Sequence, residues 1–158
     1  MVKIPRRYVP MSLTTNDAKR QLGYINKSRK AYKNGKYFVR PKVKSYKSRK
    51  SNHLQRLKSL YNVNARPSRE LELKSKCKMS ALSKIVSKGK GAYLSAGSRP
   101  NQSPESWGYA RLASALTGGN ASIVDYSILK NGCRKTSKSL KLAESLIRRN
   151  KTKKNKKI

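Results

Sequence analysis

The pattern of apolar and polar positions gives its clearest helical signal between residues 103 and 119. Ser103 and Pro104 favour a helix N-terminus, an acid follows in the first turn, and Gly118-Gly119 ends the pattern. Apolar residues between these signals recur at spacings of three and four, as on one face of a helix. The sequence therefore predicts a central helix here, with Trp107 as the anchor of the core.

Five further segments show helical periodicity, and one shows the alternation of an extended strand or arm. The helices are predicted over residues 16–34, interrupted at Gly23 and stopped by Gly35, and over 51–61, 80–88 stopped by Gly89, 120–132 and 137–149. Residues 36–46 alternate apolar and basic positions, which is typical of extended backbone. The predicted fold class is therefore mainly α.

Positive charge dominates the composition and is unevenly distributed along the chain. The 158 residues include 40 Lys or Arg and 6 Asp or Glu, a formal net charge of +34. Residues 1–60 hold 18 cationic side chains and one acid, whereas residues 101–132 hold two of each sign. Burying unpaired ammonium groups is costly, so we expect the core to form around this neutral segment.

The charge map predicts a small helical domain with basic extensions. The domain would cover residues 51–147, with an extended basic N-terminal arm at 1–50 and a Lys-rich tail at 148–158. Leu, Ile, Val and Phe account for 30 residues, so folding alone would be marginal, and a polyanion or an acidic protein surface is the expected partner. No stretch is apolar enough to span a membrane, and we expect no secretion by the ordinary route.

The two cysteines and the single histidine do not form a recognisable metal-binding motif. Cys77 and Cys133 lie 56 positions apart, and His53 is the only histidine. Two unpaired thiols are the favoured interpretation, with a disulfide as the alternative. Six scattered acids are a poor basis for paired-carboxylate catalysis. We therefore predict no metal, no cofactor and no enzymatic activity.

The basic half interleaves cations with tyrosines, a mixture that suits nucleic acid. Cations neutralise phosphates, and aromatic rings can stack on unpaired bases, although the tyrosines could instead pack their own helices. The residues predicted to contact phosphate, without sequence preference, are Arg6, Arg7, Lys27, Arg29, Lys30, Arg40, Lys42, Lys44, Lys47, Arg49, Lys50, Arg99, Arg148, Arg149, Lys151, Lys153 and Lys154.

The segment 89–104 is rich in glycine and serine and precedes a predicted helix N-terminus. It could cradle a phosphate with backbone amides, or it could be a packed structural loop in which glycines allow close approach. It lacks the glycine order of a P-loop. A DNA-processing enzyme that uses Tyr93, Ser98, Arg99 and Arg111 remains an alternative function.

The block of residues 89–119, continued by Val124-Asp125-Tyr126 and Gly132-Cys133, resembles a known sequence family. Arg7-Tyr8-Val9-Pro10 and the segment 37–46 also match, so the resemblance spans roughly residues 6–133. The family is an uncharacterised one of large double-stranded DNA viruses, both nucleocytoplasmic giant viruses and some tailed phages.

This resemblance implies a viral structural protein. Small, very basic proteins of such viruses are often minor capsid proteins on the inner capsid face, where they bridge capsid subunits and meet packaged DNA. The implied locations are the virion and, during assembly, the host nucleus or a cytoplasmic virus factory. A ribosomal or other RNA-binding structural protein is the alternative, because it would share the composition and the basic tails.

Overall fold

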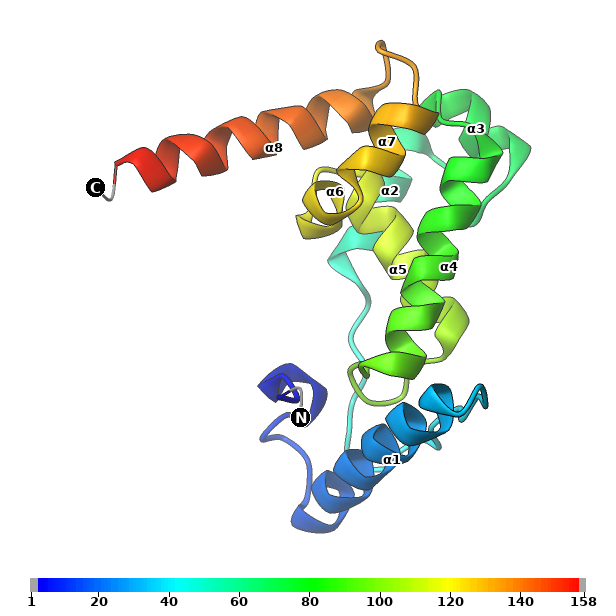
Figure 1. Cartoon of the computed structure of the whole chain (residues 1–158), viewed down its shortest axis with the longest axis vertical. Helices are drawn as coiled ribbons and strands as arrows, with labels where there is room; N and C mark the ends of the chain where they lie inside the picture. Colours follow the sequence, from blue (N-terminus) through cyan, green and yellow to red (C-terminus); the bar gives the residue numbers. More distant parts are fainter. Residues whose placement is uncertain (1–2, 157–158) are drawn as a thin grey trace. The chain divides into compact units, whose positions relative to one another are not determined.

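The computed structural model describes residues 3–156, and within them the fold is mainly α-helical (Figure 1). The elements are a short 3₁₀ helix η1 (Arg6–Tyr8) and the α-helices α1 (Thr15–Lys33), α2 (Asn52–Tyr61), α3 (Arg69–Ser75), α4 (Met79–Ser95), α5 (Pro104–Leu116), α6 (Asn120–Val124), α7 (Tyr126–Gly132) and α8 (Lys138–Asn155). This confirms the predicted fold class. None of the helices in the described range is long and apolar enough to cross a membrane.

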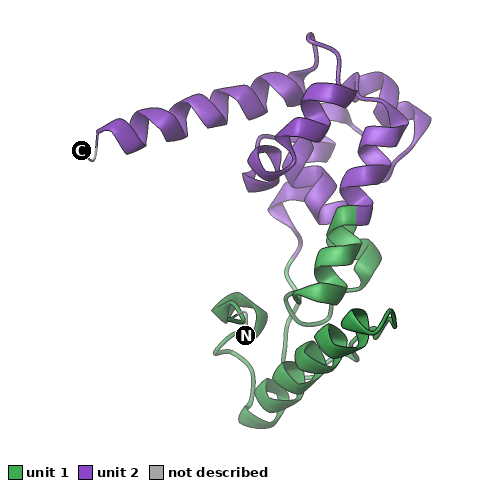
Figure 2. Cartoon of the chain, in the orientation of Figure 1, with its two compact units in different colours: residues 1–49, 88–108 green, residues 50–87, 109–158 purple. Residues whose placement is uncertain are grey.

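The chain divides into two compact units (Figure 2). Unit 1 comprises residues 1–49 and 88–108, and unit 2 comprises residues 50–87 and 109–158. Helices α4 and α5 each contribute residues to both units. The basic N-terminal segment therefore folds together with the second half of α4 and the first part of α5.

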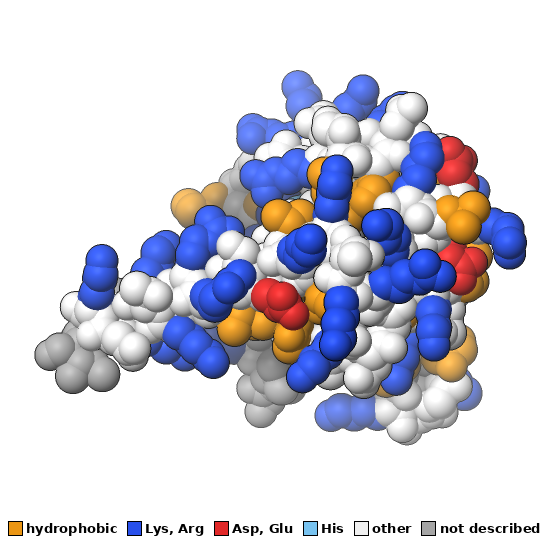
Figure 3. All heavy atoms as spheres, turned by 90° about the horizontal axis from the view of Figure 1, so that it is seen from above, with side chains coloured by type: hydrophobic (Ala, Val, Ile, Leu, Met, Phe, Trp, Pro, Cys, Tyr) orange, Lys and Arg blue, Asp and Glu red, His pale blue; other side chains and the backbone are white. Residues whose placement is uncertain are grey.

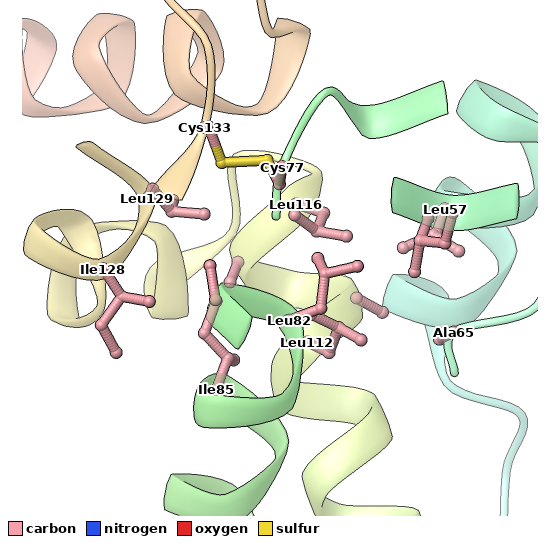
Figure 4. Close-up of a cluster of buried hydrophobic side chains, with 14 of the residues drawn as sticks. Leu57, Ala65, Cys77, Leu82, Ile85, Leu112, Leu116, Ile128, Leu129 and Cys133 are labelled. Carbon is pink, nitrogen blue, oxygen red and sulfur yellow. A yellow bond between two sulfur atoms is a disulfide. The ribbon is translucent and has the colours of Figure 1, made fainter. Parts of the chain in front are cut away.

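Unit 2 holds the main hydrophobic core (Figure 4). Helix α5 supplies Leu112 and Leu116, both with no exposed surface. The other members include Leu57, Leu71, Leu82, Ile85, Ile128, Leu129, Leu140 and Ala143. Their side chains come from α2, α3, α4, α7 and α8, so burial of apolar surface ties together segments spread along most of this unit.

A disulfide joins Cys77 and Cys133 at the edge of this core. The two residues form an isolated antiparallel bridge, flanked by hydrogen bonds from the Lys78 amide to the Gly132 carbonyl and from the Arg134 amide to the Lys76 carbonyl, both 2.8 Å. These backbone contacts bring the two sulfur atoms together. The expectation of two unpaired thiols was therefore wrong.

Unit 1 packs around α1. Ile25 of α1 and Tyr93 of α4 are fully buried, and Tyr8 is nearly so. Trp107 is only half-buried and contacts the Tyr8 ring edge-on, with ring centroids 5.8 Å apart. The prediction that Trp107 anchors the core was wrong, because the main core lies in the other unit and Trp107 lies outside it.

Two glycines that were predicted to stop or interrupt a helix lie inside one. Helix α4 continues through Gly89 to Ser95, so the first half of the predicted 89–104 loop is helical. The true stop is Gly97, whose φ of +131° suits glycine and where a Cβ would lie only 3.1 Å from the Tyr8 ring. Helix α1 is continuous at Gly23, where a side chain would meet nothing within 4 Å.

The predicted helix over 120–132 is two short helices, and one helix was missed. Asp125 separates α6 from α7, and its side chain is fully buried. Helix α3 begins at an N-cap, Ser68, whose hydroxyl accepts the Leu71 amide, with two acids in the first turn. That start signal was present in the sequence, but the helix is only seven residues long and carries little periodicity.

Candidate nucleic-acid interface

Most of the residues predicted to contact phosphate in unit 1 have exposed side chains. Arg29 of α1 is half-buried and donates from Nε to the Ala96 carbonyl at 2.8 Å. The exposed members are Arg6, Arg7, Lys27, Lys30, Lys42, Lys44, Lys47, Arg49 and Arg99. On the face drawn in Figure 3, Lys and Arg side chains are widely spread, and acidic side chains appear at few places.

In unit 2 the predicted contacts lie at Lys50 and along the end of α8. Every described residue from 148 to 156 is exposed, and these turns of α8 continue past the other helices of the unit (Figure 2). The cationic members on α8 are Arg148, Arg149, Lys151, Lys153 and Lys154. Like charges three and four positions apart on a helix repel one another, so this end of α8 gains helical stability when phosphates lie alongside it.

The acids form ion pairs or hydrogen bonds with other groups of the same chain. Glu70 pairs with Lys74 at 3.0 Å and Glu105 pairs with Lys90 at 3.8 Å. Glu72 accepts the Met79 amide. Six acids cannot neutralise 40 cations, and the acid of α8, Glu144, lies one turn before Arg148 and accepts the Tyr126 hydroxyl. The exposed positive charge therefore needs counterions from outside the chain.

Arg40 differs from the other predicted phosphate contacts because its side chain is buried. It retains only 6% of its exposure, and its guanidinium stacks on the Tyr93 ring, 3.6 Å from the ring centroid. Nη2 donates to the Ser98 hydroxyl at 2.7 Å, and Nη1 donates to the Ser28 hydroxyl at 3.1 Å and the Tyr93 carbonyl at 2.8 Å. Burial lowers the pKa of the guanidinium.

These bonds join α1, the segment after residue 36, the end of α4 and the loop that follows it. The backbone amide of Arg40 adds a bond to the Tyr93 hydroxyl at 3.0 Å. All four hydrogen bonds stay within unit 1 and satisfy its buried oxygens. The prediction that Arg40 contacts phosphate is therefore corrected: a guanidinium must reach solvent to meet a polyanion, and this one holds unit 1 together.

Replacing Arg40 with Met is expected to lower the free energy of unfolding by about 2–3 kcal/mol. The variant loses the hydrogen bonds from the guanidinium to the Ser28 and Ser98 hydroxyls and to the Tyr93 carbonyl, and the smaller desolvation cost offsets part of that loss. Arg40→Lys should not restore stability, because one ammonium cannot bond both serines and stack on Tyr93. Urea unfolding measures both values. Wild-type stability in either variant would contradict this role.

Asp17 holds the segment 36–49 against the start of α1. Its carboxylate accepts the Ser45 amide at 2.8 Å and the Ser45 hydroxyl at 2.6 Å, and Arg20 lies 3.6 Å away. These hydrogen bonds lower the pKa of Asp17 below its ordinary value of 3.8, and the bond from the Ser45 hydroxyl has the larger effect. The carboxylate also faces its own helix N-terminus, where Thr14 accepts the Asp17 amide.

This lowered pKa makes stability depend on pH. A depressed pKa stabilises the fold above the ordinary value of 3.8, and that contribution is lost as the pH falls through the folded-state pKa. Asp17→Asn should therefore show a flatter fall in Tm than wild type below about pH 4. Glu70→Gln, at an exposed ion pair, serves as the control and should behave like wild type. Equal acid sensitivity in wild type and Asp17→Asn would contradict the assignment.

The residues between α4 and α5 form a packed loop. Asn101 has a φ of +62°, and its side chain bonds both backbone groups of Val43. At the start of α5 the Ser103 and Ser106 hydroxyls each accept the other residue's amide, at 3.0 and 2.9 Å. These amides were candidates for a phosphate cradle, and protein oxygens already satisfy them. The geometry favours the structural-loop interpretation.

The residues considered for a DNA-processing enzyme do not share one environment. Tyr93 is fully buried and Ser98 is 1% exposed, whereas Arg99 is exposed. Arg111 belongs to unit 2, where Nε and Nη2 each donate to the Asp125 carboxylate at 2.8 Å. Those hydrogen bonds raise the pKa of Arg111. Each residue except Arg99 thus has an identifiable structural role.

The family model described as "Family of unknown function (DUF5824)" matches residues 5–132, which is most of the chain. The chain belongs to this family. The matched residues of this DUF5824 protein include helices α1 to α7 and end before α8. No curated protein and no solved structure matches the chain. Among residues 3–156, no three His, Cys, Asp or Glu side chains gather where they could hold a metal ion.

Proposed function

We propose that this DUF5824 protein is a non-enzymatic structural protein that neutralises nucleic-acid phosphates without reading sequence. The observation that carries the proposal is the exposed end of α8, where residues 148–155 include five Lys or Arg and no acid. Phosphate oxygens supply the missing negative charge, and binding releases the counterions that otherwise surround both partners.

We further propose that the protein acts inside a virion, as a minor capsid protein on the inner capsid face. The resemblance to proteins of large double-stranded DNA viruses supports this setting, and so does the charge of +34, which suits a compartment filled with DNA. One molecule would contact capsid subunits and packaged DNA at once. Mass spectrometry of purified, protease-treated virions tests the setting: recovery of the protein is expected, and its absence from the particles would contradict it.

The binding test uses two labelled DNA duplexes of unrelated sequence and compares them by fluorescence anisotropy. Equal affinity for both is expected, because phosphate contacts carry no sequence information. A variant with Gln at Arg148, Arg149, Lys151, Lys153 and Lys154 should bind at least about tenfold more weakly near 0.15 M salt.

A matched control exchanges Lys for Arg and Arg for Lys at the same five positions, which preserves the charge. Its affinity should stay close to that of wild type, because a phosphate contact needs the charge more than the shape of the side chain. A strong preference for one duplex, or wild-type affinity in the Gln variant, would contradict the proposal.

A further inference from the structure

Unit 1 exposes two tyrosine rings side by side at the end of α1. Tyr32 is 40% exposed and Tyr37 is 75% exposed, and their ring centroids lie 6.2 Å apart. We call this pair the tyrosine platform. Tyr8, Tyr61 and Tyr93, in contrast, are buried. Exposed aromatic rings of this kind are available for stacking with a ligand.

A helix-ending turn places the two rings together. The Gly35 amide donates to the Tyr32 carbonyl and the Lys36 amide to the Ala31 carbonyl, at 3.0 and 2.9 Å, and Gly35 has a φ of +68°. This pattern is the Schellman motif, which reverses the chain after a helix. The turn therefore places the Tyr37 ring next to the Tyr32 ring, and hydrogen-bonded backbone holds both residues.

Each tyrosine of the platform has a lysine beside it in the sequence. Lys33 follows Tyr32 in the chain and Lys36 precedes Tyr37, and both lysines are exposed. One residue further on, the Lys27 ammonium lies over the Phe38 ring, 4.5 Å from its centroid. Aromatic faces bordered by cations match the alternation of bases and phosphates in a polynucleotide.

We propose that the tyrosine platform stacks on unpaired bases of a single-stranded polynucleotide while Lys33 and Lys36 contact its phosphates. This rests on the proposed nucleic-acid function and names a substrate class for unit 1. Bases in a duplex are already stacked on each other, so only unpaired bases can cover the rings. The exposed lysines beside the platform favour an anionic partner.

The test compares two oligomers of equal length and charge, about ten nucleotides long. One is oligothymidylate, and the other is the same sugar–phosphate chain without bases. Wild type should bind oligothymidylate between about fivefold and a hundredfold more tightly, the range expected for one stacked base. Tyr37→Leu should abolish this difference and leave the affinity for the base-free chain and for duplex DNA unchanged.

Two variants serve as controls. Tyr37→Phe keeps a ring and should keep the preference for bases, and Met11→Ala removes an apolar side chain that is 98% exposed elsewhere in unit 1 and should have no effect. Circular dichroism establishes that each variant is folded.

Four results would overturn the inference. Equal affinity of wild type for the two oligomers would show that the rings do not stack, and an equal loss for every ligand in Tyr37→Leu would show a merely structural role. Weaker binding of polyglutamate by Tyr37→Leu would assign the platform to an acidic protein instead. If wild type bound none of the nucleic acids, the proposed function would be rejected as well. The other results reject base stacking on the platform and leave the nucleic-acid function standing.

Discussion

Removing the Cys77–Cys133 disulfide is expected to lower the free energy of unfolding by about 4 kcal/mol. The bond closes a loop over a sequence separation of 56, and a cross-link of that span restricts the unfolded chain strongly. The double variant Cys77→Ala/Cys133→Ala tests this by urea unfolding. Because both residues belong to the core of unit 2, Ala keeps part of the packing and isolates the effect of the bond.

Reduction of the wild-type protein provides the matched control. Dithiothreitol should lower the stability of wild type by a similar amount and should leave the double variant unchanged. Thiol counting by mass spectrometry before unfolding establishes the oxidised state. A double variant within about 1 kcal/mol of wild type would contradict a stabilising role for the bond.

Replacing Arg111 with Met is expected to cost about 3–5 kcal/mol of folding stability. The substitution leaves the Asp125 carboxylate, which has no exposed surface, without the two 2.8 Å hydrogen bonds from the guanidinium. A buried carboxylate without its cation must either stay charged at a high cost or take up a proton. Asp125 also separates α6 from α7, so its disturbance spreads to both short helices.

A double variant distinguishes loss of the pair from loss of packing. Arg111→Met/Asp125→Leu removes both charges and should be at least about 2 kcal/mol more stable than Arg111→Met alone. Arg134→Met, at an exposed arginine of the same unit, is the matched control and should change stability by less than about 0.5 kcal/mol. Equal stability of Arg111→Met and Arg134→Met would contradict the importance of the pair.

Local signals predicted the helices that carry their own caps. The start of α5 follows from Ser103 and Pro104, and the end of α1 from Gly35, because capping depends on neighbours in sequence. Glycine itself is ambiguous: Gly89 lies within a helix and Gly97 ends it. The close approach of Tyr8 to Gly97 involves residues far apart in sequence, and no local pattern contains it.

Long-range contacts set the limit on what could be predicted of the candidate site. The charge map correctly implied that most cations would be exposed, because few acids are available to pair with them. It could not single out Arg40, whose partners Ser98 and Tyr93 lie more than 50 positions away. The neutral segment 101–132 did predict a core, and the pair of Arg111 with Asp125 explains its balance of charge.

The exposed cations are the basis of the account, and the salt dependence of DNA binding tests them most directly. The measurement is the slope of log affinity against log salt for the full-length chain on duplex DNA, to which each neutralised phosphate contributes about −0.9. We predict a slope of about −5 or steeper, equal for unrelated sequences. A slope near zero, or no binding even at low salt, would contradict the claim that these surfaces receive a polyanion.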